Sequence, residues 1–330
     1  MMLEDYHLIK GYKKLARFKI AASIKARDVP TDKLWDEHER IRSKFKECYE
    51  KQIMKSCETS FLDLKIKIAD NIFKSCHFCE RRCNINREKE TGYCGVLEPR
   101  IASEFLHFGE ETPLVPSHTI FFSGCTFHCV FCQNWDISQN PQGGVFIKAK
   151  NLARLIDEKR RRGSFNVNFV GGDPTPNLNY ILKVISYFEE NIPIIWNSNF
   201  YMSKEAMKLL DGIIDLYLTD FKFGNNKCAK TLADAKNYWK IITRNHLLAK
   251  KSADMIIRHL VLPGHLECCT IPILSWIADK LGENTPINIM GQYRPVYHAM
   301  EYPKIDRYPT REEIYTAREY ARELGLTNLL

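Results

Sequence analysis

The chain has 330 residues, which is enough for one large α/β domain with a smaller addition. Its apolar fraction of 45% and charged fraction of 27% exclude wholesale disorder, and no apolar run is long enough to span a bilayer. The N-terminus carries acidic residues early and has no continuous apolar core, so we expect no signal peptide, no membrane partner and a cytoplasmic location.

Residues 1–75 are predicted to form a helical extension. They contain almost no Gly or Pro after position 33, and Leu62, Ile66 and Ala69 follow helical spacing. This segment carries 17 Lys and Arg against 12 Asp and Glu, part of a net charge of +8. We interpret the excess as a solvated helical surface and expect no nucleic-acid partner, because no RNA-binding signature accompanies it.

Residues 76–118 are expected to form an irregular, Cys-rich metal-binding module followed by a connector. Cys76, Cys79, Cys83 and Cys94 have the pattern C-x2-C-x3-C-x10-C. In a reducing compartment such spacing indicates metal or redox chemistry rather than disulfides. Four thiolates can complete a tetrahedral site, and the soft ligand set suits zinc or an iron–sulfur cluster. A structural clip and an electron relay are both consistent with the pattern.

From residue 119 onwards, short apolar runs alternate with longer amphipathic segments. Six alternations predict a parallel sheet with right-handed helical connections, either doubly wound or curved into an incomplete barrel. The expected strands cover residues 119–123, 165–170, 192–196, 216–220, 255–262 and 286–290. The expected helices cover residues 149–162, 179–189, 203–210, 229–250, 269–281 and 310–323.

The first of these strands leads into a cysteine loop, GCTFHCVFCQNW. Cys125, Cys129 and Cys132 have the spacing C-x3-C-x2-C. Three thiolates are one fewer than a closed iron–sulfur or structural zinc site uses, so one metal position stays open for an exogenous ligand. The loop follows a strand directly, where ligand sites of parallel β/α folds gather. Three unrelated thiols or a partial zinc site are the alternatives.

This spacing, with the aromatic Phe131 before the third cysteine, resembles the radical S-adenosylmethionine superfamily. The resemblance implies a 4Fe–4S cluster on Cys125, Cys129 and Cys132 that reductively cleaves S-adenosylmethionine to a 5′-deoxyadenosyl radical. It implies that the Phe131 backbone lies against the adenine, and that a low-potential flavodoxin- or ferredoxin-type protein donates electrons. The implied fold is a partial (β/α)6 TIM-like barrel over residues 119–330, with the cofactor at the carboxyl ends of the strands.

Polar residues follow the ends of the later strands. The Gly-Gly-Asp turn after the second strand resembles the superfamily motif that orients the methionyl amine, and glycines allow a ligand to approach the backbone closely. Amides, hydroxyls and charged groups at the other strand ends suit the ribose and the carboxylate. The residues expected to contact S-adenosylmethionine, besides Phe131, are Gly171, Gly172, Asp173, Asn197, Ser198, Asn199, Asp220, Lys222, Arg258, His265 and Gln292.

The strand ends around Asp220–Lys222 and Arg258–Gly264 resemble the pyruvate formate-lyase activating enzyme branch, especially relatives with a Cys-rich segment before the barrel. That branch implies a protein or peptide substrate. Asn197 stands where well-studied activases carry an Asp, so a cation site proposed there loses a carboxylate. The alternatives are radical modification of a small molecule or RNA, a non-catalytic iron–sulfur electron carrier, and a zinc-organised binding module.

Five further cysteines lie outside both motifs. Cys268 and Cys269 are adjacent past the fifth strand, where one of them is a candidate hydrogen-atom donor or ligand. Free cysteines are also common core residues, which is the simpler interpretation. Cys48, Cys57 and Cys228 have no partner in the sequence and are expected to be structural.

Overall fold

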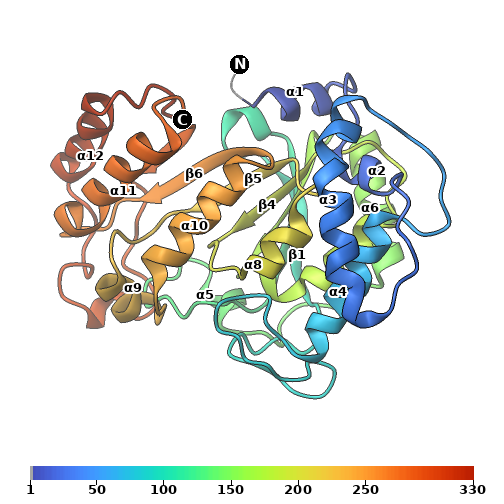
Figure 1. The fold of residues 1–330 in the computed structure, drawn as a ribbon. Coiled ribbons are helices and arrows are strands. Elements are labelled where there is room, and N and C mark those ends of the chain that lie inside the picture. The colour runs from blue at the N-terminus through green and yellow to red at the C-terminus, as the bar shows by residue number, and fades with distance from the viewer. Residues whose placement is uncertain (1–2) are drawn as a thin grey trace.

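A seven-stranded sheet forms the centre of the computed structural model, which describes residues 3–330 (Figure 1). The strands lie side by side in chain order; β2 to β7 are parallel, and β1 is antiparallel to β2. The sheet is open, which confirms the predicted partial barrel. The strands are β1 (Ile101–His107), β2 (Ser117–Phe122), β3 (Asn166–Gly171), β4 (Ile194–Ser198), β5 (Leu216–Asp220), β6 (Asp254–Leu260) and β7 (Ile287–Met290).

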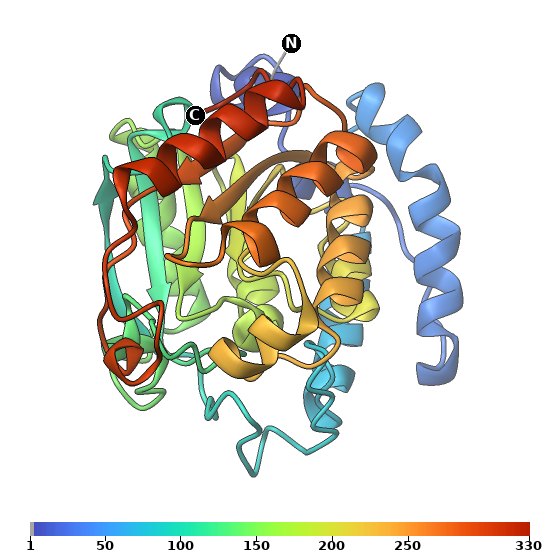
Figure 2. The same ribbon diagram turned by 90° about the vertical axis from the view of Figure 1, so that its left-hand side faces the viewer.

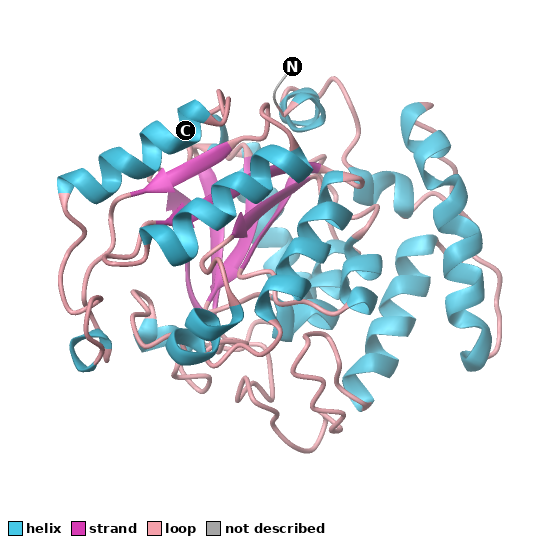
Figure 3. Cartoon of the chain, turned by 60° about the vertical axis from the view of Figure 1, so that its left-hand side comes forward, coloured by secondary structure: helices cyan, strands magenta, loops and turns pink. Residues whose placement is uncertain are grey.

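Helices connect the parallel strands and lie along the outside of the sheet (Figures 2 and 3). Large side chains such as Phe122, Phe169 and Trp196 are fully buried in the core. Among residues 3–330, no helix is both long and apolar enough to cross a membrane. The helices of this part are α5 (Trp135–Ser138), α6 (Ala149–Arg161), α7 (Leu178–Ile185), α8 (Lys204–Leu210), α9 (Asn226–Ala233), α10 (Tyr238–Lys250), α11 (Ile271–Trp276) and α12 (Arg311–Glu323).

Three features differ from the sequence prediction. The connector before the barrel contains β1, an added antiparallel edge strand. The single helix expected over 229–250 is two helices, because Asp234 and Asn237 adopt left-handed φ values of 50° and 52°. Asp and Asn tolerate that conformation better than other side chains, and it ends a helix. Short π-helical turns, Leu266–Thr270 and Ile277–Leu281, also flank α11.

The N-terminal extension closes the amino end of the barrel. Figure 1 shows α1 at that end and the Cys-rich module at the opposite one. The backbone N–H of Tyr6 donates to Asp254 at 2.8 Å, and that of Arg17 donates to Asp215 at 2.9 Å. Leu3 and Tyr6 also join a small apolar cluster with residues of β4, β5 and β6. The helices are α1 (Glu4–Lys10), α2 (Arg17–Ala21), α3 (Leu34–Glu50) and α4 (Phe61–Lys74).

Candidate active site

The carboxyl ends of the parallel strands converge on a cavity of about 280 Å³. The cysteine loop after β2 forms one wall, and residues at the ends of β3 to β7 form the others. The structure thus brings most of the predicted site residues to a single place. Those that line the cavity are Cys125, Cys129, Phe131, Cys132, Gly171, Gly172, Asn197, Ser198, Asn199, Asp220, Lys222, Arg258 and Gln292.

The three loop thiols are suited to a metal cluster. Cys125 Sγ accepts the Phe127 N–H at 3.4 Å and the Asn199 amide at 3.7 Å, which are contacts typical of metal-bound thiolates. Burial raises the pKa of Cys125, and it raises the pKa of Cys129 to about 12, so both are neutral thiols unless a cation replaces their protons. A 4Fe–4S cluster on Cys125, Cys129 and Cys132 fits this donor set.

The spacing of the thiols also favours a cluster over a single ion. In a tetrahedral zinc site with Zn–S bonds of about 2.3 Å, the sulfurs lie roughly 3.8 Å apart. Neither predicted cysteine set, within the part of the chain that the structure describes, contains three sulfurs all within 4.8 Å of one another. A cluster separates its thiolates further, because each of them binds a different iron.

Two glycines let β3 approach the cysteine loop. Gly171 has a φ of +123°, and a Cβ there would lie 2.2 Å from the backbone N and O of Phe122. A Cβ on Gly172 would lie 2.1 Å from the carbonyl oxygen of Gly124. No side chain fits at either position, so backbone alone forms this wall of the cavity.

Asp173 does not line the cavity but connects three strand ends beneath it. Its carboxylate accepts hydrogen bonds from Thr126 at 2.6 Å, Ser198 at 3.0 Å and Thr175 at 3.0 Å. Asn199 donates to the same Thr126 hydroxyl at 2.8 Å. Asp173 therefore positions the cysteine loop and the β4 end. Thr126, which joins them, was not selected from the sequence, where nothing distinguishes it from other loop threonines.

Charged side chains at the ends of β5 and β6 are paired. Lys222 Nζ lies 2.7 Å from Asp220, and the Arg258 guanidinium contacts Glu111 at 2.7 Å and also Glu110. Burial opposes ionisation of Glu111, but the hydrogen bonds and the charge of Arg258, together with the Asn288 amide, lower the pKa of that carboxyl. Arg258 lines the cavity while two carboxylates from the segment before β2 hold it in place. Sequence analysis missed both carboxylates.

The segment after β7 covers the cysteine loop. The His298 N–H donates to the Val130 carbonyl at 2.9 Å, and the Gln292 carbonyl accepts the Gln133 amide at 3.2 Å. Next to these contacts, Trp135 and Tyr297 stack with ring centroids 5.6 Å apart while 47% and 39% exposed. Tyr297 of this segment and Trp135 of α5 therefore form an exposed aromatic pair beside the loop.

His265 is the other predicted contact that does not line the cavity. It follows β6, and its Nδ1 lies 2.8 Å from the carbonyl oxygen of Pro263. The structure therefore does not bring it to the other residues of the site.

The second cysteine set surrounds a separate, enclosed cavity that Thr126 of the cysteine loop also lines. Arg87 is 1% exposed there and directs Nη1 at Cys76 Sγ, 3.7 Å away. Its Nε and Nη2 are buried without a hydrogen-bond partner among the described residues. Burial raises the pKa of Cys79 and Cys94. A buried cation beside four clustered thiols indicates a site built for an anionic metal–thiolate group.

Comparisons with known proteins agree with this geometry. Residues 119–277 match the family model described as the radical SAM superfamily. The chain is 50% identical over 321 residues to the uncharacterized protein MJ0674 of Methanocaldococcus jannaschii, covering 94% of each chain. It is 26% identical to the uncharacterized protein MJ0808 of the same organism, covering 79% of this chain and 81% of that one.

Solved structures give weaker matches. Streptococcus suis SuiB bound to S-adenosylmethionine aligns with a TM-score of 0.48 at 16% identity, over 62% of this chain and 47% of that one. The structure of TYW1 with a lysine-pyruvate adduct bound aligns with a TM-score of 0.44 at 13% identity, over 62% and 73% of the two chains.

Proposed function

Because this chain belongs to the radical SAM superfamily, whose enzymes use a 4Fe–4S cluster and S-adenosylmethionine, we propose that Cys125, Cys129 and Cys132 hold the cluster and leave one iron open. When bound, the cluster supplies the electron that splits the sulfonium of S-adenosylmethionine and yields a 5′-deoxyadenosyl radical. The observation that carries this proposal is the convergence of the three thiols, two glycines and the polar strand ends on one cavity.

The lining residues then have distinct tasks. The backbone at Gly171 and Gly172 lines the place for the methionyl part of the cofactor, and the absence of side chains lets this backbone pack against Phe122 and Gly124. The amide of Asn197 offers a partner for hydroxyl or carboxylate groups, while the amide of Asn199 holds Cys125 and Thr126. Apolar lining by Phe131, with Leu260 and Met290, excludes water from the reacting centre.

We assign a second iron–sulfur cluster, rather than zinc, to Cys76, Cys79, Cys83 and Cys94. Their sulfurs are spaced too widely for one zinc ion, and the buried Arg87 charge offsets part of the negative charge of a four-thiolate cluster. The cavity adjoins the cysteine loop through Thr126, so the cluster is placed to relay electrons from an external low-potential donor.

The second cluster has a direct test in the iron content of the reconstituted chain. We expect about eight irons per chain, falling to about four in Cys79→Ala, with cleavage of S-adenosylmethionine by dithionite retained. About one zinc per chain at these thiols, with about four irons in both proteins, would contradict the second cluster.

The substrate that we propose is a protein or a peptide. Trp135 and Tyr297 form an exposed aromatic pair beside the cysteine loop, and Met300, 66% exposed, follows shortly after in the chain. Aromatic and methionine side chains are enriched where proteins contact one another. A substrate held on this surface would present a reactive C–H bond to the adjoining cavity.

Deuterium transfer identifies the substrate class. The reconstituted enzyme would be incubated with S-adenosylmethionine, dithionite and an extract of the native cells grown in deuterated medium, divided by ultrafiltration. We expect deuterium in 5′-deoxyadenosine only with the macromolecular fraction, and expect protease but not RNase to abolish it. Deuterium from the small-molecule filtrate, or its loss on RNase treatment, would favour the respective alternative.

Radical chemistry is tested with Cys129→Ala, and Cys48→Ala is the matched control. The first should lose both cluster iron and 5′-deoxyadenosine formation, while the second, outside both cysteine sets, should keep both. Formation of 5′-deoxyadenosine by the Cys129 variant would contradict the assignment. An intact, reducible cluster that never cleaves S-adenosylmethionine, with or without extract, would favour the electron-carrier alternative.

A further inference from the structure

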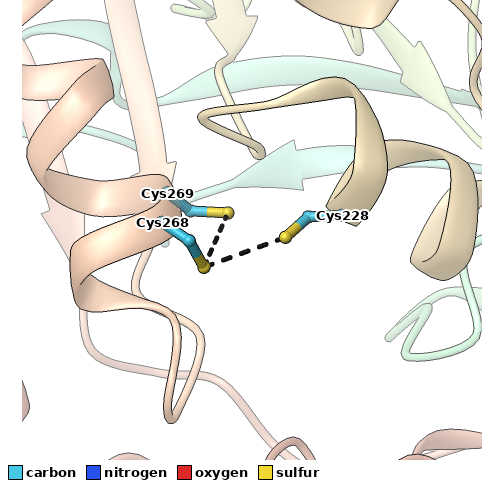
Figure 4. A group of neighbouring side chains, drawn as sticks. All are labelled: Cys228, Cys268 and Cys269. Atoms are coloured by element: carbon cyan, nitrogen blue, oxygen red, sulfur yellow. Dashed lines mark hydrogen bonds between the residues drawn. The ribbon is translucent and has the colours of Figure 1, made fainter.

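Three cysteines outside both sites come together on one side of the barrel (Figure 4). Cys228 lies in the first turn of α9, and Cys268 and Cys269 lie in the π-helical turn after β6. The Sγ of Cys268 lies 3.8 Å from that of Cys228 and 3.9 Å from that of Cys269, and all three sulfurs are within 4.8 Å of one another. Cys228, expected from the sequence to have no partner, therefore belongs to a three-thiol group.

These separations match one metal ion. The sulfurs of a tetrahedral zinc site lie roughly 3.8 Å apart, which is the spacing of both measured edges. The two other cysteine sets are spaced more widely and suit clusters, so the chain contains thiol groups of two different sizes.

The backbone around the triad fixes its shape before any metal arrives. Gly224 packs against the π-helical turn so closely that a Cβ there would lie 2.6 Å from Cys268 O and from Cys269 Cα. The side-chain amide of Asn225 donates to Cys268 O at 2.7 Å and to Cys228 Sγ at 3.3 Å. Amide donors to sulfur are typical of the hydrogen bonds that orient metal-bound thiolates.

The three thiols of the triad differ in their access to solvent. Cys269 is buried, Cys228 is half-buried and Cys268 is exposed. Burial raises the pKa of Cys268 and Cys269, so without a cation these are protonated thiols. Three thiols with an open side match zinc sites that keep a fourth position free, and they differ from closed structural sites with four ligands.

We propose that Cys228, Cys268 and Cys269 bind one zinc ion as three thiolates, with a water or an incoming thiol in the fourth position on the Cys268 side. Binding releases three thiol protons, changes no oxidation state, and leaves a zinc–thiolate group with one net negative charge. The Asn225 amide and the N-terminal end of α9 partly offset that charge. The site needs no radical chemistry and stands independently of the proposed function.

Zinc titration of the anaerobically reconstituted full-length protein tests the site. Wild type should retain one zinc per chain after gel filtration. Cys228→Ser and Cys268→Ser should bind zinc at least on the order of 100-fold more weakly than wild type. Asn225→Ala should bind zinc ~10- to 100-fold more weakly. Cys57→Ser, outside the triad, and Cys83→Ser, from the second cysteine set, should both retain the zinc. Cobalt(II) in its place should give a thiolate charge-transfer band that disappears in Cys268→Ser.

Three outcomes would overturn the proposal. Equal zinc retention by wild type and both triad variants would place the ion elsewhere. A Cys228–Cys268 disulfide in protein isolated without oxygen, found by mass spectrometry, would make the group a redox pair. Binding of copper(I) but not zinc by wild type would remove the assignment to zinc. Because activity is not the readout, failure here leaves the radical enzyme assignment untouched.

Discussion

Replacing Gly171 with alanine tests the claim that the contact between the end of β3 and the end of β2, next to the cysteine loop, leaves room for backbone only. Gly163, in the connection before β3, is a matched control: its φ is +103° against +123° at Gly171, but a Cβ there would meet nothing within 4 Å. Both substitutions carry the strain of a positive φ, on the order of 1–3 kcal/mol. Only Gly171→Ala adds a steric clash.

The clash determines how much more Gly171→Ala destabilises the protein than Gly163→Ala does. The new Cβ would lie 2.2 Å from the Phe122 backbone, where ordinary contact begins at 3.4 Å, so the strands must separate by about 1.2 Å. That movement disturbs the hydrogen bond from Gly172 N–H to Phe122 O, now 2.8 Å, and the neighbouring ladder. One or two lost hydrogen bonds at about 1 kcal/mol each, plus about 1–3 kcal/mol of overpacking, make Gly171→Ala roughly 2–5 kcal/mol more destabilising than Gly163→Ala.

Urea unfolding of the two variants, followed by tryptophan fluorescence, measures this difference. A 5′-deoxyadenosine assay on the folded protein should show loss of cleavage in Gly171→Ala and near-normal cleavage in Gly163→Ala. If the two variants unfold within about 0.5 kcal/mol of each other, the close approach of β3 to the end of β2 is wrong, because strain alone is common to both.

Three further changes have defined outcomes. Thr126→Val should cost about 1–3 kcal/mol in urea unfolding, because Asp173 loses a buried donor, while Thr126→Ser should stay near wild type. Arg258→Met should cost about 3–5 kcal/mol by leaving Glu110 and Glu111 without their cation, and adding Glu111→Gln should recover part of it; a purely additive double variant would argue against this pairing. Burial lowers the pKa of His246 from 6.5 to about 4. The unfolded chain therefore takes up a proton at a higher pH than the folded protein does. The free energy of unfolding is unaffected by this above pH 6.5 and decreases by about 3 kcal/mol in all as the pH falls towards 4. The loss of unfolding free energy between pH 7 and pH 4 should shrink in His246→Gln, and an unchanged pH slope would contradict a neutral buried imidazole.

Local patterns were sufficient to predict much of this fold and of the candidate site. The six parallel strands were predicted because each is an apolar run followed by an amphipathic helix. The residues placed at their ends, such as Asn197 and Lys222, then meet because parallel strands end at one edge of a sheet. The extra strand β1 was missed because it lies at the edge of the sheet and most of its side chains are not buried. Its sequence therefore lacks the regular alternation of apolar and polar residues that predicts a strand.

Contacts between residues far apart in the chain could not be predicted from the sequence. Arg258 meets Glu111 across 147 positions, and Cys228 meets Cys268 across 40. Neither pairing leaves a trace in local composition, because both depend on how the connections wrap around the sheet. Arg87 is similar: it looks like an ordinary charged loop residue until folding buries it beside Cys76.

The packing of the N-terminal extension against the amino end of the barrel has a consequence for the synthesis of the protein. The N-terminal extension leaves the ribosome before the barrel does, yet Tyr6 and Arg17 hydrogen-bond to residues synthesised 160, 198 and 248 positions later. Contacts across such separations form late, since a long stretch of chain must be ordered before they stabilise anything. Nascent chains that stop before β6 therefore leave Tyr6 of α1 without its partners Asp254 and Ile256, so the amino end of the barrel is completed only after β6 has been made.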